Sequence, residues 1–140
     1  NPLHLAVMYT AFSNSGSMIT PYLIYKDDPS AEVWIDQAIS KEHSSLLTED
    51  LKAVVNNPAG SGYAAHRTDM ELAGKTGTAE LKSEQGTTGQ EIGWFSVFTT
   101  DPSASKPVLL TSMVESVEDK GGSTYVVKKD AAVLDSYFGS

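Results

Sequence analysis

The run Ala73–Glu80 (AGKTGTAE) constrains this chain most, because apolar residues flank a short polar insert on both sides. This pattern predicts a β-strand, whose successive side chains point to opposite faces. Thr76 and Thr78 are therefore expected on one face, and Lys75 and Gly77 on the other. Glycine is a poor strand former and often marks close approach of a ligand or another backbone. A Lys-Thr-Gly triplet alone is weak evidence, since a solvated strand edge or turn can also contain it.

The composition describes a globular domain or part of one. The chain has 140 residues, of which 40% are apolar and 20% charged, so it can bury a core of its own. The net charge of −8, without a basic stripe, argues against a nucleic-acid partner. The absence of cysteine excludes disulfides and thiol catalysis. There is no apolar run of membrane-spanning length, and the chain starts at Asn1 without methionine, so we expect a piece of a longer protein.

Three helices are predicted. Asn1 can cap a helix over about residues 2–14, and Ser40 can cap a second helix that ends near residues 56–58. The apolar stripe of this second helix comprises Leu47, Leu51, Val54 and Val55. Ser123 is expected to cap a last amphipathic helix. Its apolar residues are Val126, Val127, Val133, Leu134, Tyr137 and Phe138.

The remaining pattern is that of β-structure. Residues 20–25 and 32–35 are β-prone and could pair as a small hairpin. After the Lys-Thr-Gly strand, residues 83–90 read as a polar connection, and residues 91–98 are apolar on both faces, as in an interior strand. Residues 108–117 are a further apolar, β-branched strand. The fold class is therefore predicted as α+β, with an antiparallel three-strand meander flanked by helices.

Five motifs occur in one order along the chain. They are Asn1–Leu3, Ala73–Lys82 (AGKTGTAELK), Gln85–Gly89 (QGTTG), Ile92–Phe95 (IGWF) and Val117–Tyr125 (VEDKGGSTY). Together they resemble the class B penicillin-binding proteins, and most closely the low-affinity, methicillin-resistance-type branch of Gram-positive bacteria. The resemblance implies part of a penicillin-binding, β-lactamase-like transpeptidase fold.

The resemblance also implies roles for the Lys-Thr-Gly strand. Lys75 would supply positive charge for the terminal carboxylate of a D-Ala-D-Ala stem peptide or of a β-lactam, and Thr76 would donate its hydroxyl to the same carboxylate. Gly77 would leave the groove open for the ligand backbone. The backbone N–H of Thr78 would form half of the oxyanion hole. Glu80 is a further candidate, because it is expected on the face of the two threonines.

The chain departs from the family in its nucleophile. In this superfamily a catalytic serine opens a Ser-x-x-Lys helix ahead of Lys-Thr-Gly, and a Ser-x-Asn motif is also present. Here Ser-x-Asn is absent, and the one Ser-x-x-Lys is Ser103–Lys106, which lies in a turn between strands with Pro107 directly after it. We interpret it as a solvated turn. Residues 1–140 are thus expected to be the C-terminal portion of a transpeptidase domain, lacking the half with the nucleophilic serine and inactive alone.

The intact protein would then be a D,D-transpeptidase that cross-links peptidoglycan by serine acyl transfer at the extracytoplasmic face of the bacterial plasma membrane. Its partners would be the stem peptide, β-lactams and the missing N-terminal half of the domain, and no cofactor is implied. Two alternatives stay open. One is a β-lactam sensor or a β-lactamase relative, and the other is a non-catalytic module that holds peptides along the Lys75 strand.

Other polar and aromatic residues suggest no separate site. His4, His43 and His66 are far apart and form no metal-ligand pattern. His43 and His66 are expected to be solvated, and His4 could lie on the surface or on a packing face. Trp94, in an apolar strand, is expected in the core. Glu91 is expected to be a surface charge.

Overall fold

The computed structural model describes residues 1–24, 27, 30–82, 84, 89–101 and 103–139. The elements are α1 (Pro2–Ser13), β1 (Met18–Ile19), β2 (Val33–Ile35), α2 (Lys41–Asn56), the 3-10 helix η1 (Tyr63–Ala65), β3 (Leu72–Leu81), β4 (Gln90–Thr99), β5 (Leu109–Glu115) and α3 (Ser123–Phe138). Helices and antiparallel strands are both present, so the predicted α+β class is confirmed. No helix within these described ranges has the length and apolar character needed to cross a membrane.

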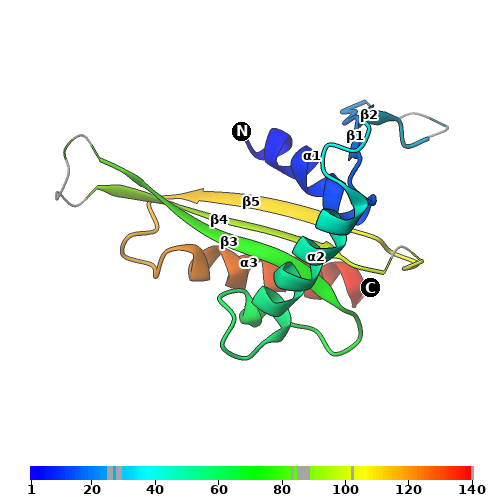
Figure 1. Cartoon of the computed structure of the whole chain (residues 1–140). Coiled ribbons are helices and arrows are strands. Elements are labelled where there is room, and N and C mark those ends of the chain that lie inside the picture. Colours follow the sequence, from blue (N-terminus) through cyan, green and yellow to red (C-terminus); the bar gives the residue numbers. More distant parts are fainter. Residues whose placement is uncertain (25–26, 28–29, 83, 85–88, 102, 140) are drawn as a thin grey trace.

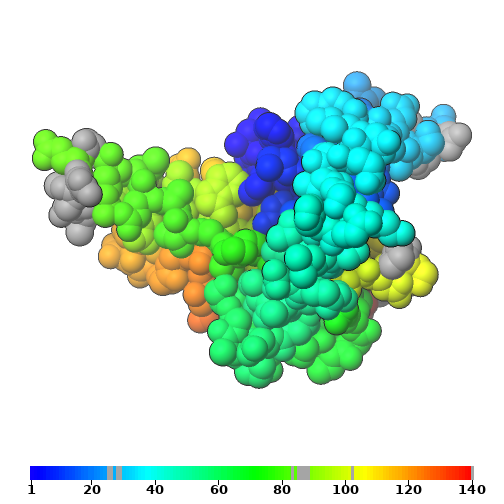
Figure 2. All heavy atoms as spheres, in the orientation of Figure 1, coloured from blue at the N-terminus to red at the C-terminus, as the bar shows by residue number. Residues whose placement is uncertain are grey.

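The main sheet is an antiparallel meander in the order β3-β4-β5. Its register places Thr76 opposite Phe95, and Phe95 in turn opposite Ser112 of β5. Figure 1 shows α1 on one face of this sheet and α3 on the other. Within the described ranges β3 pairs with β4 alone, so β3 is an edge strand. The end of the β3–β4 pair where β3 finishes and β4 begins projects from the body of the molecule (Figure 2).

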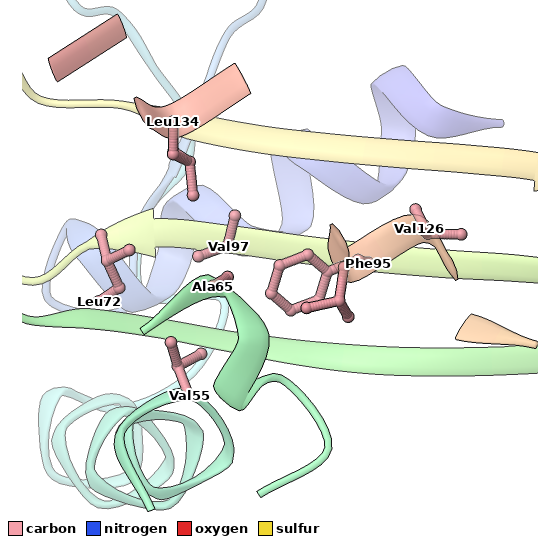
Figure 3. Packing of buried hydrophobic residues seen from close by; sticks show 8 residues of the cluster. Val55, Ala65, Leu72, Phe95, Val97, Val126 and Leu134 are labelled. Atoms are coloured by element: carbon pink, nitrogen blue, oxygen red, sulfur yellow. The ribbon is translucent and has the colours of Figure 1, made fainter. Parts of the chain in front are cut away.

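The larger core lies between the sheet and α3. Its buried residues come from α2, η1, β3, β4 and α3, and Figure 3 shows their side chains pointing into the space between these elements. They are Val55, Ala65, Leu72, Phe95, Val97, Val126, Val127 and Leu134. Burying one Val, Leu or Phe side chain stabilises a fold by about 1.5–3 kcal/mol. This cluster therefore holds β3 firmly at its Leu72 end.

The opposite face of the sheet packs against α1. Phe98 points to this face and makes ring contacts with Tyr9 and Phe12 of α1, at centroid distances of 6.2 and 6.3 Å. Because Phe95 and Phe98 point to opposite faces, β4 is buried on both sides along this part. The predicted interior strand is thus confirmed.

Two of the three predicted helix caps are present. Asn1 accepts a hydrogen bond from the first turn of α1, and Ser40 does the same for α2. The prediction for Ser123 is wrong, because Gly122 is the N-cap residue of α3 and Ser123 is already helical. Gly122 has φ +62°, a left-handed conformation that glycine adopts without strain. Glycine has no side chain that could accept a hydrogen bond from the helix.

The small hairpin forms with different bounds from those predicted. Its first strand is Met18–Ile19 and not residues 20–25, and it pairs with Val33–Ile35. The N–H of Thr20 still donates to the carbonyl of Glu32 at 2.8 Å, and pairing ends at Pro21, whose ring fixes φ at about −65°, outside the usual range of an antiparallel strand. Of the predicted strand, residue 25 lies outside the described residues.

The α2 stripe also differs from the prediction at one position. Val55 is fully buried, whereas Leu47 is 41% exposed. The first half of α2 instead turns Ser44 and Thr48 toward α1: the Ser44 hydroxyl donates to the carbonyl of Ala11 at 3.0 Å, and that of Thr48 donates to the carbonyl of Phe12 at 3.5 Å. Polar contacts therefore replace the apolar ones there. Most of the predicted 83–90 connection lies outside the described residues, including residues 85–88 of the QGTTG motif.

Candidate functional site

The two faces of β3 differ as the alternation predicts. Lys75 is exposed, whereas Thr76 retains only 9% of its accessible surface. Thr76 faces the α3 side together with Phe95, its partner on β4, and Thr78 lies on the same side opposite Gly93. One edge strand thus presents a cation on one face and two hydroxyls on the other.

The amine of Lys75 has no acidic partner within the part of the chain that the structure describes. Its Nζ donates instead to the backbone carbonyl of Thr76, at 2.8 Å. A backbone carbonyl does not neutralise an ammonium, so this cation remains available for a carboxylate. Hydrogen bonds between charged groups are about twice as strong as neutral ones.

Behind Lys75 the sheet is polar. Ser96 lies directly opposite Lys75 on β4, is buried, and has its hydroxyl 3.1 Å from that of Thr111 on β5. Burial raises the pKa of the Tyr9 phenol, and a hydrogen bond with Ser96 opposes that rise. These contacts give Ser96 polar partners on the α1 side of the sheet, and none of them involves Lys75.

The hydroxyl of Thr76 lies 2.7 Å from that of Ser61. Ser61 belongs to the segment between α2 and β3, residues 59–69, in which the sequence analysis named no site residue other than the histidine it set aside. The flanking Gly60 and Gly62 were the available signal, because paired glycines often permit close approach of backbone segments. Ser61 is therefore a candidate site residue that the sequence analysis missed.

Two glycines of β3 differ in what surrounds them. A Cβ on Gly74 would lie 2.6 Å from the carbonyl oxygen of Ser96, so packing requires glycine there. A Cβ on Gly77 would meet only the Cβ of Trp94, at an ordinary 3.5 Å, and the φ of Gly77 is not positive. Neither packing nor conformation of the described residues explains Gly77.

Trp94 is only partly buried on this face, so its prediction as a core residue is wrong.

Thr78 connects β3 to α3. Its side chain is exposed, and its Oγ1 accepts a hydrogen bond from the backbone N–H of Ser123 at 3.3 Å. Thr78 thus supplies a hydrogen-bond acceptor for the first amide of α3, whose N-cap residue is Gly122. This contact fixes the position of Thr78 relative to α3.

Glu80 shares the face of the two threonines, as predicted, but it contacts neither of them. It forms an ion pair with Lys82 and lies directly opposite Glu91 on β4. The backbone N–H of Glu91 donates to Glu118 at 3.1 Å. The structure therefore places Glu80 in a charged region at the far end of the strand.

The histidines do not gather. His4 and His43 are exposed, whereas the prediction of a solvated His66 is wrong. The His66 ring stacks on Tyr63 and its Nδ1 lies 3.2 Å from Oδ1 of Asn56. Among the described residues, His, Asp and Glu form no group of three that could hold a metal ion.

The Ser103–Lys106 segment lies in the turn between β4 and β5. The backbone N–H and the hydroxyl of Ser103 both donate to Oδ1 of Asp101, at 2.8 and 2.7 Å. This arrangement is an Asp-initiated turn and not the start of a helix. The interpretation of this serine as part of a solvated turn is confirmed.

Comparisons with known proteins agree with this fold. Residues 1–134 match the family described as penicillin binding protein transpeptidase domain. The chain is 43% identical over 130 residues to penicillin-binding protein 3 of Bacillus subtilis. That alignment covers 92% of this chain but 19% of the relative.

Solved structures share the fold. The transpeptidase domain of Burkholderia pseudomallei penicillin-binding protein 3 matches 96% of this chain and 41% of its own, with TM-score 0.72 and 22% identity. The D,D-transpeptidase domain of a peptidoglycan glycosyltransferase from Eggerthella lenta matches 97% of this chain and 31% of its own, with TM-score 0.67 and 26% identity. The chain spans about a fifth of the curated relative and less than half of either solved chain. Because residues 1–134 match this family, the chain belongs to the penicillin-binding protein transpeptidase domain family.

Proposed function

We propose that residues 1–140 are the C-terminal portion of a serine D,D-transpeptidase domain, which cross-links peptidoglycan stem peptides by acyl transfer and binds β-lactams. The observation that carries this proposal is the edge strand β3, where an unneutralised Lys75 stands beside a glycine, Gly77, that internal packing does not require. A cation and an open backbone position together suit an extended peptide with a terminal carboxylate.

Each residue of the strand then has a chemical role. Lys75 attracts the carboxylate of D-Ala-D-Ala or of a β-lactam from one face of β3, and Thr76 donates its hydroxyl to the same group from the other face, so the carboxylate would lie at the open edge of the strand. Gly77 lets the ligand backbone approach the strand. The backbone N–H of Thr78 stabilises the negative charge that develops on the attacked carbonyl oxygen. Glu80 stands at the end of this surface, where it would meet only the more distant part of a bound stem peptide.

The nucleophilic serine and its base belong, in this proposal, to the rest of the domain, which precedes residue 1. The parent protein acts at the extracytoplasmic face of the bacterial plasma membrane, where peptidoglycan is assembled. The IGWF and VEDKGGSTY motifs support placement in the low-affinity, methicillin-resistance-type branch.

The proposal is tested by mass spectrometry after incubation with benzylpenicillin. The 140-residue chain should remain unmodified, whereas the parent protein should gain one penicilloyl group. Lys75→Ala in the parent should slow acylation by about tenfold or more, as expected for the loss of a charge-assisted contact of about 1.5–3 kcal/mol. Lys129→Ala, which removes an exposed lysine of α3, is the matched control.

The same experiment separates the alternatives. An adduct on the isolated chain would overturn the assignment of the nucleophile to the rest of the domain. Rapid hydrolysis of the acyl-enzyme would identify a β-lactamase relative, and a stable adduct without transpeptidation of a stem peptide would identify a sensor. A folded parent that is never acylated but still binds the peptide would identify a non-catalytic module.

A further inference from the structure

The hydroxyls of Ser61 and Thr76 join the proposed ligand-binding strand to the loop that precedes it. The two oxygens are 2.7 Å apart, and geometry allows either hydroxyl to be the donor. Thr76 is nearly buried, whereas Ser61 is exposed. The hydroxyl of Ser61 can therefore exchange partners with solvent, but that of Thr76 has few other partners to choose from.

The loop that carries Ser61 is held by its own backbone. The N–H of Gly62 donates to the carbonyl of Val54 at 3.0 Å, and the N–H of Gly60 donates to that of Asn57 at 2.7 Å. A Cβ on Gly60 would lie 2.2 Å from the Val54 carbonyl oxygen. Both glycines therefore let the loop lie against the end of α2, which fixes Ser61 beside β3.

The chemistry of a carboxylate decides the direction of the hydrogen bond. A hydroxyl carries one proton, and an ionised carboxylate can only accept. If Thr76 donated to Ser61, it would present lone pairs to a bound carboxylate and repel it. If Ser61 donates to Thr76, the Thr76 proton is free, and polarisation along the chain of hydroxyls strengthens its bond to the ligand.

We infer that Ser61 is a positioning residue, which donates to Thr76 and so directs the Thr76 proton toward the ligand carboxylate. This inference rests on the proposed function, because it requires a carboxylate bound at β3. Ser61 does not touch the ligand in this arrangement, so its whole effect on binding passes through the hydroxyl of Thr76.

A double-mutant cycle in the parent enzyme tests the inference. The measured quantity is the second-order rate constant for acylation by benzylpenicillin. Ser61→Ala should lower it about fivefold, the size expected for one net hydrogen bond. In a Thr76→Val background the same change should have less than about a twofold effect, because the hydroxyl through which Ser61 acts is already gone.

Two further variants complete the test. Ser61→Thr keeps a hydroxyl at this position and should restore the rate to within about twofold of wild type. Ser45→Ala removes an exposed serine hydroxyl from α2 and should leave the rate unchanged. Thermal unfolding of every variant should show native-like transitions, so that a lost fold is not read as lost positioning.

The outcomes are distinguishable. Equal losses from Ser61→Ala in the wild-type and Thr76→Val backgrounds would overturn the inference, since Ser61 would then act by another route. A Ser61→Thr variant as slow as Ser61→Ala would overturn it as well. If the wild-type parent is folded and is not acylated at all, the proposed function itself fails, and the inference fails with it.

Discussion

The hydroxyl of Thr78 on β3 accepts a hydrogen bond from the backbone N–H of Ser123, 3.3 Å away at the start of α3. These residues are 45 positions apart, and the contact supplies the cap that Gly122 cannot. It joins the strand of the proposed oxyanion hole to the helix that covers the same face of the sheet. The position of the Thr78 backbone is therefore coupled to the stability of α3.

Thr78→Val should lower the free energy of unfolding by about 1 kcal/mol, the usual cost of losing a helix cap. Valine keeps the shape of threonine but cannot accept a hydrogen bond from Ser123. Thr78→Ser keeps the acceptor and is the matched control, with a smaller expected loss. Urea denaturation of the 140-residue chain measures both. Equal losses in the two variants would show that the hydroxyl is not the cause.

Gly74→Ala and Gly77→Ala should affect different properties: the first should lower stability, and the second should slow acylation. Gly74→Ala places a methyl group against the Ser96 carbonyl oxygen and should destabilise the chain by about 1–3 kcal/mol. Gly77→Ala should leave the melting temperature nearly unchanged but slow penicillin acylation of the parent enzyme, because the methyl group occupies the space proposed for the ligand. A large loss of stability in Gly77→Ala would instead assign this glycine a structural role.

Asp130 should make the stability of the chain pH-dependent. Its side chain is buried between α3 and β5, Oδ1 accepts from the Ser112 hydroxyl at 2.7 Å, and Oδ2 has no partner among the described residues. Burial raises the pKa of this carboxyl, although the Ser112 hydrogen bond opposes the rise. The folded state therefore holds the proton more tightly than the unfolded chain does. The stability from this group is complete below the unfolded pKa and is lost as the pH rises through the folded pKa.

Asp130→Asn cannot ionise and keeps an oxygen that can accept from Ser112. The variant should be more stable than wild type at neutral pH, by about 1 kcal/mol, and this advantage should disappear in acid. Thermal unfolding over a pH series measures the difference. Asp50→Asn, which removes an exposed carboxylate from α2, controls for the change in net charge. An Asp130→Asn advantage that does not vary with pH would contradict the prediction.

Glu91→Gln should stabilise the β3–β4 pair slightly. Glu80 and Glu91 are directly opposite each other, and like charges at such positions are unfavourable by about 0.2–1 kcal/mol. Glu80→Gln should help less, because it also removes the ion pair with Lys82. Both differences should shrink in high salt, which screens exposed charges. A salt-independent gain would point to packing and not to charge.

Local patterns in the sequence were sufficient for most of the fold. Side-chain alternation placed Lys75 and Thr76 on opposite faces of β3, and the capping positions Asn1 and Ser40 marked two helix starts. Such signals depend on neighbours a few residues away, so they can be read without knowing the fold. They fail where a distant group intervenes, as at Ser123, whose amide is bound by Thr78 and whose preceding glycine forms the cap.

The Lys-Thr-Gly strand could be proposed as a binding surface from the sequence, because the polar insert and the ordered motifs around it are local patterns of residue types. Three other features could not be predicted: the partner of the Thr76 hydroxyl, the open space at Gly77 and, among the described residues, the lack of a partner for Oδ2 of Asp130. Each depends on which backbone and side-chain atoms the packing of α2, α3 and the sheet brings within about 3 Å, the range of a hydrogen bond. The order of residues in the sequence does not state those distances, so they are seen only in the folded structure.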